Sequence, residues 1–267
     1  MATHPFDEAL ELTAGEAGTL TGKTSPDWAN MVGPFGGMTA ATLLRAVEMQ
    51  PERIGHPVAM TVNFTAPVAD GAFDVRAAAV RTNRSNQHWT IELSQDGEIK
   101  TTATAVFGHR RDTWADVERQ RPPAPAPEEV PAEGLPEAIV WARNYDMRHV
   151  DGAPPMDGQP RASSASTLWV RDSRGRAMDY AALTAFSDIF YPRVYRRLGA
   201  PLPAGTISMT AYFHAAAAEL ASVGADFILG RAQANRFAGG YFDQSAELWS
   251  RGGDLLVTTH QLVYFKT

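Results

Sequence analysis

One carboxylate of the sequence lies where a charge is costly. Asp188 interrupts an apolar run, with Ala185-Phe186 before it and Ile189-Phe190 after it. A charged group among aromatic side chains lowers stability unless it is paired or has a function. Such a carboxylate can take a proton from a water molecule and serve as a general base. It could instead cap a helix or form a structural salt bridge, for example with Arg193.

Gln261 is a second polar residue in apolar surroundings. It lies in the last strand-like segment, where apolar residues between Val257 and Tyr264 occupy both alternating sets. Because side chains alternate across a strand, Gln261 has apolar neighbours on whichever face it takes. A buried amide is normally hydrogen-bonded, so we expect a partner such as a water molecule or Asp188. An ordinary cross-strand hydrogen bond would meet the same need.

Two glycines, Gly36 and Gly37, precede a segment rich in helix formers that runs to Met49. The free amides and the dipole at the start of a helix favour negative charge. These residues could therefore bind a substrate oxygen that gains charge, or a phosphate. Glycine could equally be present only because it allows close packing of the helix on a sheet.

The elements that must position these residues begin with a repeated pattern. Residues 56–64 and 205–213 each carry an apolar residue at every second position, and they match at a constant offset (209 − 60 = 149). A period of two that repeats in register is typical of β-strands. The matched positions are Val58, Met60, Val62 and Phe64 in the first segment and Ile207, Met209, Ala211 and Phe213 in the second.

Further strand patterns follow in each half. Alternation over residues 89–93 leads to residues 95–98, which predict a tight hairpin turn. The second half has a corresponding strand over residues 242–248. The pair Thr101-Thr102 matches Thr258-Thr259 at a larger offset (258 − 101 = 157). Both halves are therefore expected to form antiparallel sheets.

Each half also has one helix candidate ahead of its main strands. The first covers residues 37–49, and the second covers residues 180–190 and continues unevenly past Pro192 to Leu198. One helix followed by several antiparallel strands, twice over, predicts an α+β architecture. A helix wrapped by a curved sheet is the simplest way to bury both apolar faces.

Repeated prolines between residues 121 and 131 divide the chain. Proline lacks an amide donor and favours extended geometry, so this stretch is typical of a surface linker. We therefore expect an N-terminal domain over residues 1–115, a Pro-rich linker over residues 116–136, and a C-terminal domain over residues 137–267 that carries the catalytic residues.

The composition restricts the class of protein. The chain has 267 residues, of which 44% are hydrophobic and 20% charged, as in ordinary folded proteins. It has no cysteine, which excludes disulfides, thiolate nucleophiles and cysteine-ligated metals. A formal net charge of −6 argues against nucleic-acid binding, which usually needs a basic face.

The sequence lacks the patterns of a membrane span, a secretory signal, a metal site and a serine-hydrolase site. No apolar run approaches the roughly 20 residues that span a bilayer, and the N-terminus has no secretory signal pattern. We therefore expect a cytoplasmic protein without a membrane span. The histidines have no spacing suited to a metal site, and no GxSxG serine-hydrolase motif occurs. We expect neither a metal nor a cofactor.

Several short motifs follow one another along the chain. They are Phe35-Gly36-Gly37 and residues 56–67 in the first half, and residues 144–148, Ser187-Asp188, Thr206-Ile207, Phe213-His214 and Gln261 in the second. Taken in order, these motifs resemble those of the type II (medium- and long-chain) acyl-CoA thioesterases. The similarity covers nearly the whole chain apart from the termini and the linker. Residues 215–218 depart most, because alanines replace an arginine-containing pattern, which concerns the surface where substrate would enter.

The resemblance implies a double hotdog fold, in which two tandem hotdog domains each wrap a curved antiparallel sheet around a long helix. It also implies that Asp188, Thr206 and Gln261 hold a water molecule that attacks a thioester. Gly36 and Gly37 could then bind the thioester oxygen. The substrate would be an acyl-CoA, and the family favours a homo-oligomer of double-hotdog units.

Thr206 is selected only by its distance from Phe213-His214 in the motif. Strand alternation places it with Ser208 on the face opposite Met209, so periodicity does not distinguish it. Ser208 is therefore an alternative source of the hydroxyl.

Two other functions remain open. A hotdog hydratase or dehydratase that acts on acyl-CoA usually needs a His–Asp pair, and no such motif stands out. A non-catalytic acyl-CoA-binding protein would not need an aspartate, a threonine and a glutamine together, so the combination argues against it.

Overall fold

The computed structural model describes residues 3–132, 139–155 and 157–267. The first half contains α1 (Pro5–Ala9), β1 (Thr13–Ala14), β2 (Leu20–Lys23), α2 (Gly36–Glu48), β3 (His56–Phe64), β4 (Ala72–Thr82), β5 (Asn86–Gln95) and β6 (Glu98–Gly108). The second half contains β7 (Tyr145–Asp151), β8 (Ser166–Asp172), α3 (Tyr180–Phe186), α4 (Arg193–Leu198), β9 (Ala204–Phe213), α5 (Ala217–Val223), β10 (Ile228–Gln233), β11 (Phe237–Ala238), β12 (Tyr241–Ser250) and β13 (Leu255–Phe265). The predicted α+β architecture is confirmed.

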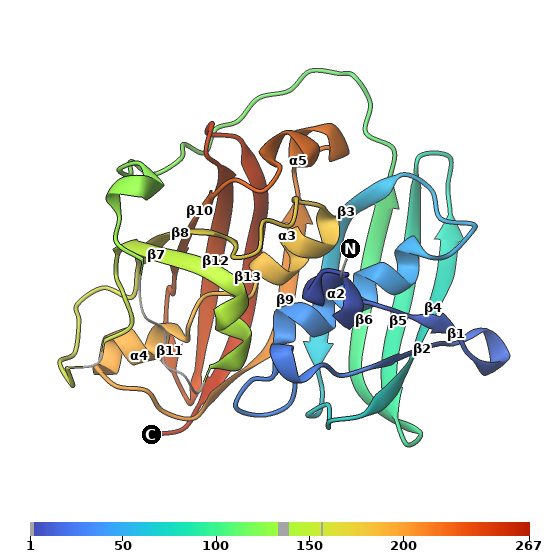
Figure 1. The fold of residues 1–267 in the computed structure, drawn as a ribbon, viewed down its shortest axis with the longest axis horizontal. Helices are drawn as coiled ribbons and strands as arrows, with labels where there is room; N and C mark the ends of the chain where they lie inside the picture. The colour runs from blue at the N-terminus through green and yellow to red at the C-terminus, as the bar shows by residue number, and fades with distance from the viewer. Residues whose placement is uncertain (1–2, 133–138, 156) are drawn as a thin grey trace.

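The strands of the described residues form one antiparallel sheet that runs through both halves. Its order is β1-β2-β4-β5-β6-β3-β9-β13-β12-β10-β8-β7, with β11 beside β12. The halves join where β3 pairs with β9, near the middle of the sheet (Figure 1). Thr61 lies opposite its own counterpart Thr210, 149 residues later, and their hydroxyl oxygens are 2.9 Å apart. A local pseudo-two-fold axis therefore passes between these threonines, as the matched strands predicted.

Both central strands contain a β-bulge at the same place. The extra residue is Val58 in β3 and Ile207 in β9, where the register with the neighbouring strand shifts. A bulge adds one residue, so side chains before it take the opposite face from the one that simple alternation predicts. Val58 and Ile207 are accordingly only partly buried, unlike Met60 and Met209. The prediction that all four share one buried row is therefore wrong at the bulge.

The register also corrects the match between the last strands. Thr101 lies opposite Phe64, and Val257 lies opposite Phe213. Because Phe64 and Phe213 are counterparts, Thr101 corresponds to Val257 (257 − 101 = 156) and not to Thr258. The predicted offset of 157 is wrong by one residue, which in a strand places every side chain on the wrong face.

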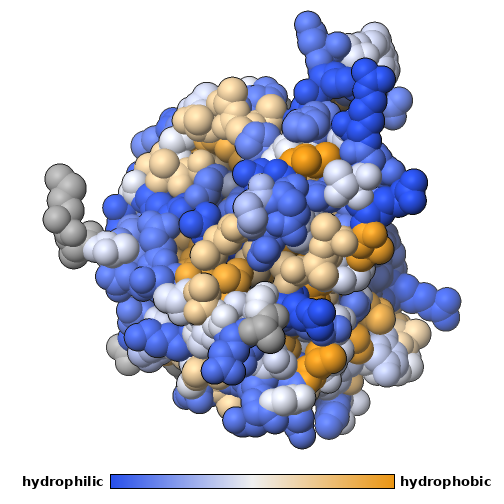
Figure 2. Space-filling view, turned by 90° about the vertical axis from the view of Figure 1, so that its right-hand side faces the viewer, coloured by the Kyte–Doolittle hydropathy of each residue, from blue (hydrophilic) through white to orange (hydrophobic). Residues whose placement is uncertain are grey.

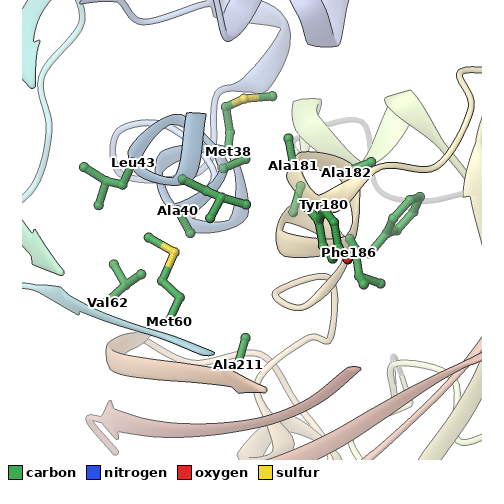
Figure 3. Close-up of a cluster of buried hydrophobic side chains, with 14 of the residues drawn as sticks. Met38, Ala40, Leu43, Met60, Val62, Tyr180, Ala181, Ala182, Phe186 and Ala211 are labelled. Carbon is green, nitrogen blue, oxygen red and sulfur yellow. The ribbon is translucent and has the colours of Figure 1, made fainter. Parts of the chain in front are cut away.

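Helices α2 and α3 lie side by side and cover the inner face of the central strands (Figure 1). The alanines, leucines and methionines of α2 are strong helix formers, and all but a few of its residues are buried. Figure 3 shows Ala40 and Leu43 of α2 over Met60 and Val62 of β3, with Phe186 of α3 alongside. These five side chains are at most 2% exposed, so the helices and the sheet share one core.

The second helix is shorter than predicted. It ends at Phe186, and the Ser187 hydroxyl donates to the Leu183 carbonyl oxygen at 2.9 Å in the closing turn. Helix resumes as α4 only after Pro192, which has no amide hydrogen to continue the ladder. Asp188 therefore lies in the turn after α3 and not within a continuous helix.

Part of the predicted linker packs against the second half. The Trp169 indole donates to the Pro125 carbonyl oxygen at 2.9 Å, and Arg148 donates to the Pro127 carbonyl oxygen at 2.9 Å. Val130 is 5% exposed and joins a small core with Trp169, Phe227, Leu229 and Trp249. The stretch just before residue 131 is therefore a structured part of the molecule. Residues 133–136 of the predicted linker, and the next two residues, lie outside the described residues.

The side of the molecule that carries β1, β2, β4 and β5 faces the viewer in Figure 2, and hydrophilic and apolar residues are interspersed on it. Within the described ranges, no helix is both long and apolar enough to cross a membrane.

Candidate active site

Asp188, Thr206 and Gln261 come together in the fold, although they lie in three separate segments. Gln261 of β13 donates from Nε2 to Asp188 Oδ1 at 2.9 Å and to the Ser187 carbonyl oxygen at 3.4 Å. Thr206 of β9 donates from Oγ1 to Gln261 Oε1 at 3.2 Å. The three side chains therefore form one hydrogen-bonded chain, and Gln261 is its middle member.

Alternation alone places Thr206 on the outer face of the sheet, and this expectation is wrong. Thr206 lies opposite Val263, which is 2% exposed, so both side chains point to the inner face. Ser208, the alternative hydroxyl, lies opposite Leu262, which is 42% exposed on the outer face. The bulge at Ile207 accounts for the difference, because it reverses the alternation between the two positions.

The environment of Asp188 favours its neutral form. Burial raises the pKa of Asp188 to about 7, because desolvation disfavours the carboxylate. Hydrogen bonds from the Gln261 side chain and from the backbone N–H of Gly37 oppose this rise by stabilising the charge. Arg193, the salt-bridge partner considered above, instead donates to Gln244 Oε1 at 3.0 Å. The carboxylate thus titrates near neutrality, where a general base works best.

Gly36 and Gly37 begin α2 directly beside Asp188. A Cβ at Gly36 would lie 2.6 Å from Asp188 Oδ2, and a Cβ at Gly37 would lie 2.5 Å from the Ala185 carbonyl oxygen. Both glycines are therefore needed for the close approach of α2 to the end of α3. The Gly37 amide binds the Asp188 carboxylate, whereas Gly36 lines the adjacent cavity.

A cavity of about 360 Å³ opens onto this group. Asp188, Thr206 and Gly36 line it, and Gln261 is absent from the residues that do so in the described part of the chain. Asp188 and Thr206 can therefore touch a bound molecule, whereas Gln261 acts on them from behind. A larger hollow of about 860 Å³ lies at the other end of α2, near Glu48, and contains none of the three residues.

Sequence reasoning missed other residues of this cavity. Thr39 and Thr101 line it, and Phe64, which the pattern identified only as a core residue, does so as well. Met31 and Val32 line it with side chains that are 67% and 70% exposed, so they mark its mouth. The repeat of threonines after residue 100 was the only available signal for Thr101, and it suggested the wrong counterpart.

The residues that the structure describes were expected to hold no metal ion. No group of three or more His, Cys, Asp or Glu side chains there could hold a metal ion.

Family models match both halves of the chain. The acyl-CoA thioesterase N-terminal domain matches residues 24–108, and the acyl-CoA thioesterase C-terminal domain matches residues 118–265. This chain belongs to the acyl-CoA thioesterase family. The second match begins inside the segment predicted as a linker, in keeping with the packing of that segment. None of the curated proteins matches the sequence.

Solved structures support the double hotdog fold. A conserved protein of unknown function with a hot dog fold from Alicyclobacillus acidocaldarius is 45% identical, with a TM-score of 0.95 over 100% of this chain and 99% of that one. The tesB protein of Mycobacterium avium subs paratuberculosis is 20% identical, with a TM-score of 0.79 over 98% of both chains. The acyl-CoA thioesterase II TesB2 of Mycobacterium marinum is 16% identical, with a TM-score of 0.76 over 98% of both chains. The predicted fold class is confirmed.

Proposed function

We propose that this protein hydrolyses acyl-CoA thioesters to a free acid and CoA. The observation that carries the proposal is Asp188, a carboxylate with a pKa of about 7 that faces a cavity at the start of a helix. Its Oδ2 lies on the side of Gly36, while Oδ1 accepts the hydrogen bond from Gln261. One carboxylate oxygen is thus held in place and the other can receive a proton from water.

The proposed reaction assigns a role to each group. Asp188 takes a proton from a water molecule, whose oxygen attacks the thioester carbonyl carbon. Thr206 positions the water through a lone pair of its hydroxyl, since the hydroxyl hydrogen is directed to Gln261. The start of α2 at Gly36 stabilises the oxyanion with its amide and dipole. When the carbon–sulfur bond breaks, Asp188 returns its proton to the CoA thiolate.

Gln261 takes a different role from the one expected from the resemblance. It contacts both Asp188 and Thr206 but does not line the cavity, so we assign it to positioning these two side chains. Gly37 belongs to the same support, because its amide holds the Asp188 carboxylate.

The organisation of the chain is part of the proposal. We place an N-terminal hotdog domain at residues 1–115, a connection at residues 116–136, and a C-terminal hotdog domain with the catalytic residues at residues 137–267. A cytoplasmic location and a homo-oligomer of double-hotdog units stay predictions, which fractionation and light scattering would test.

The decisive experiment compares the wild-type protein with Asp188→Asn. Asparagine keeps the shape and an acceptor oxygen but cannot take the proton, so kcat should fall by about 10²–10⁴-fold. CoA release, detected with a thiol reagent, measures the rate across acyl lengths. In the wild type, kcat/KM should rise as the pH approaches 7 and level off above it, because the base must be deprotonated.

The same assay separates the other two functions. A hydratase or dehydratase would change the acyl chain without releasing CoA, and a binding protein would release none while still retaining the ligand. Near-normal turnover by a folded Asp188→Asn protein would show that Asp188 is structural and that the base lies elsewhere.

A further inference from the structure

A buried hydroxyl without a partner lies in the wall of the active-site cavity. Thr101 is 0% exposed and lines the cavity, and its Oγ1 has no hydrogen-bond partner among the residues that the structure describes. Burying a hydroxyl without a partner costs free energy, and folded proteins rarely keep such a group. The wall of the same cavity also contains Thr39, but that hydroxyl is directed to the Phe35 carbonyl oxygen at 3.5 Å.

The second half shows that the fold does not need this hydroxyl. The counterpart of Thr101 is Val257, which lies at the same register position and is also 0% exposed. Valine and threonine have nearly the same shape, so the packing at this position is satisfied by an apolar side chain. The hydroxyl of Thr101 is therefore an addition that serves neither packing nor a hydrogen bond within the described chain.

The position of Thr101 identifies the part of a substrate that would meet it. Thr101 pairs with Phe64, whose ring Cζ would lie 3.4 Å from a Cβ placed on Gly36. Gly36 is the residue beside the Asp188 carboxylate, so Thr101 is one residue removed from the wall that faces the reacting carbonyl, on the side of Phe64. The wall that the second half supplies includes Thr206 and the 39% exposed Tyr264, and we take this side as the place where the CoA portion would leave the cavity.

We propose that the acyl group of the substrate carries an oxygen substituent, a hydroxyl or oxo group, that hydrogen-bonds to Thr101. This inference rests on the proposed thioesterase function and adds the chemical class of its substrate. The remaining wall around Thr101 includes the side chains of Phe64 and Val68, which would contact the apolar carbons of the acyl chain. An unpaired buried hydroxyl in such a wall would favour an oxygenated acyl group over a plain one.

The test measures kcat/KM for hexanoyl-CoA and for its 3-, 4- and 5-hydroxy derivatives. The wild type should hydrolyse at least one hydroxylated ester about 3- to 10-fold more efficiently than hexanoyl-CoA, which is the effect of one neutral hydrogen bond. In Thr101→Val the ratio of kcat/KM for the preferred hydroxylated ester to kcat/KM for hexanoyl-CoA should fall to about 1, whatever the change in the absolute rates. Thr101→Ser, which keeps the hydroxyl, should retain the preference.

Two results would overturn the inference while leaving the thioesterase proposal intact. One is a wild type that hydrolyses hexanoyl-CoA and shows no preference for any hydroxylated ester. The other is a Thr101→Val protein that loses activity equally toward all four esters, which would indicate a general packing role. If the wild type releases CoA from none of the esters, the proposed function fails together with the inference. The melting temperature of Thr101→Val should equal or exceed that of the wild type, which confirms that the variant is folded.

Discussion

The two halves of the molecule share a backbone but differ in what they carry on it. Both central strands bulge at the same place, yet Thr206 just before one bulge corresponds to Pro57 just before the other. Gln261 corresponds in the same way to Ala105 of the first half. The first half thus keeps the fold with apolar residues at both positions. The proposed chemistry therefore depends on a few side chains and not on the duplicated scaffold.

The two ends of the helix pair differ just as clearly. At one end, the start of α2 meets Asp188, whose described contacts include no cation. At the other end, Glu48 and Asp179 approach each other, and their charges are offset by arginines. Arg176 contacts Asp179 at 2.6 Å, and Arg45 contacts Glu48 at 3.6 Å. Arginines therefore pair with the carboxylates at one end, whereas the carboxylate at the other end has no such partner in the described chain and is kept for a proton.

The largest expected effect is on how the free energy of unfolding depends on pH, which tests whether the Asp188 carboxyl is buried without a cation. The pKa of Asp188 rises on folding from 3.8 to about 7, so its protonated form favours the folded state. That contribution is complete below about pH 4 and is lost as the pH rises through 7, with an upper value of about 4 kcal/mol that solvation in the cavity reduces. Asp188→Asn cannot ionise, so its stability relative to the wild type should increase from pH 5 to pH 8 in urea unfolding.

The matched control for this prediction is Asp179→Asn at the other end of the helices. Asp179 binds Arg176 and accepts a hydrogen bond from the Ala182 amide at 2.8 Å, so its loss of charge should lower stability at pH 8. Equal stability differences for Asp188→Asn at pH 5 and pH 8 would show that the Asp188 carboxyl is not desolvated as the structure indicates.

A second expected effect follows from giving the second half the residue of the first. Gln261→Ala removes the donor to Asp188 and the acceptor for Thr206, so the two groups that face the cavity lose their orientation. A hydrogen bond to a charged group contributes about 1.5–3 kcal/mol, so kcat should fall by about 10- to 100-fold. Steady-state kinetics with one acyl-CoA at saturation would measure the loss.

Thr259→Val is the control for Gln261→Ala. Thr259 lies two residues earlier in β13 on the same buried face, and its hydroxyl has no partner in the described chain. Its replacement should leave kcat unchanged. If both variants lose activity to the same degree, the effect of Gln261→Ala reflects disturbed packing of β13 and not the contacts of the amide.

The sequence predicted the architecture well because that architecture depends on repeated patterns. The matched strands around Met60 and Met209 gave the duplication and the pairing of the two halves, and the Asp96-Gly97 turn joins β5 to β6 with positive φ at both residues. Asp188 and Gln261 could be selected because a polar group in an apolar run needs a partner. The contact between them was anticipated for the same reason.

Other features of the site depended on local events that alternation does not encode. The inward direction of Thr206 results from one extra residue at Ile207, and the place of Asp188 results from a helix that stops at Phe186. Neither a bulge nor an early helix end changes the apolar pattern on either side. Thr101 was missed because its counterpart can be identified only from the register of paired strands.

The smallest expected effect comes from exchanging the residues that the two halves carry at the matched positions Thr101 and Val257. Thr101→Val removes a buried hydroxyl that has no partner in the described part of the chain, whereas Val257→Thr introduces a hydroxyl at the same register position of the other half. An unpaired buried hydroxyl costs about 1–3 kcal/mol, so Val257→Thr should lower the free energy of unfolding by about that amount. Thr101→Val should raise it or leave it unchanged, because the methyl group fills the same space. Urea unfolding of the two variants and the wild type, at one pH and without substrate, measures both values.

A loss of stability in Thr101→Val comparable to that in Val257→Thr would show that the Thr101 hydroxyl is hydrogen-bonded in the free protein, for example by water. The two halves would then be alike in satisfying their buried polar groups, and the hydroxyl would no longer distinguish the cavity of the first half.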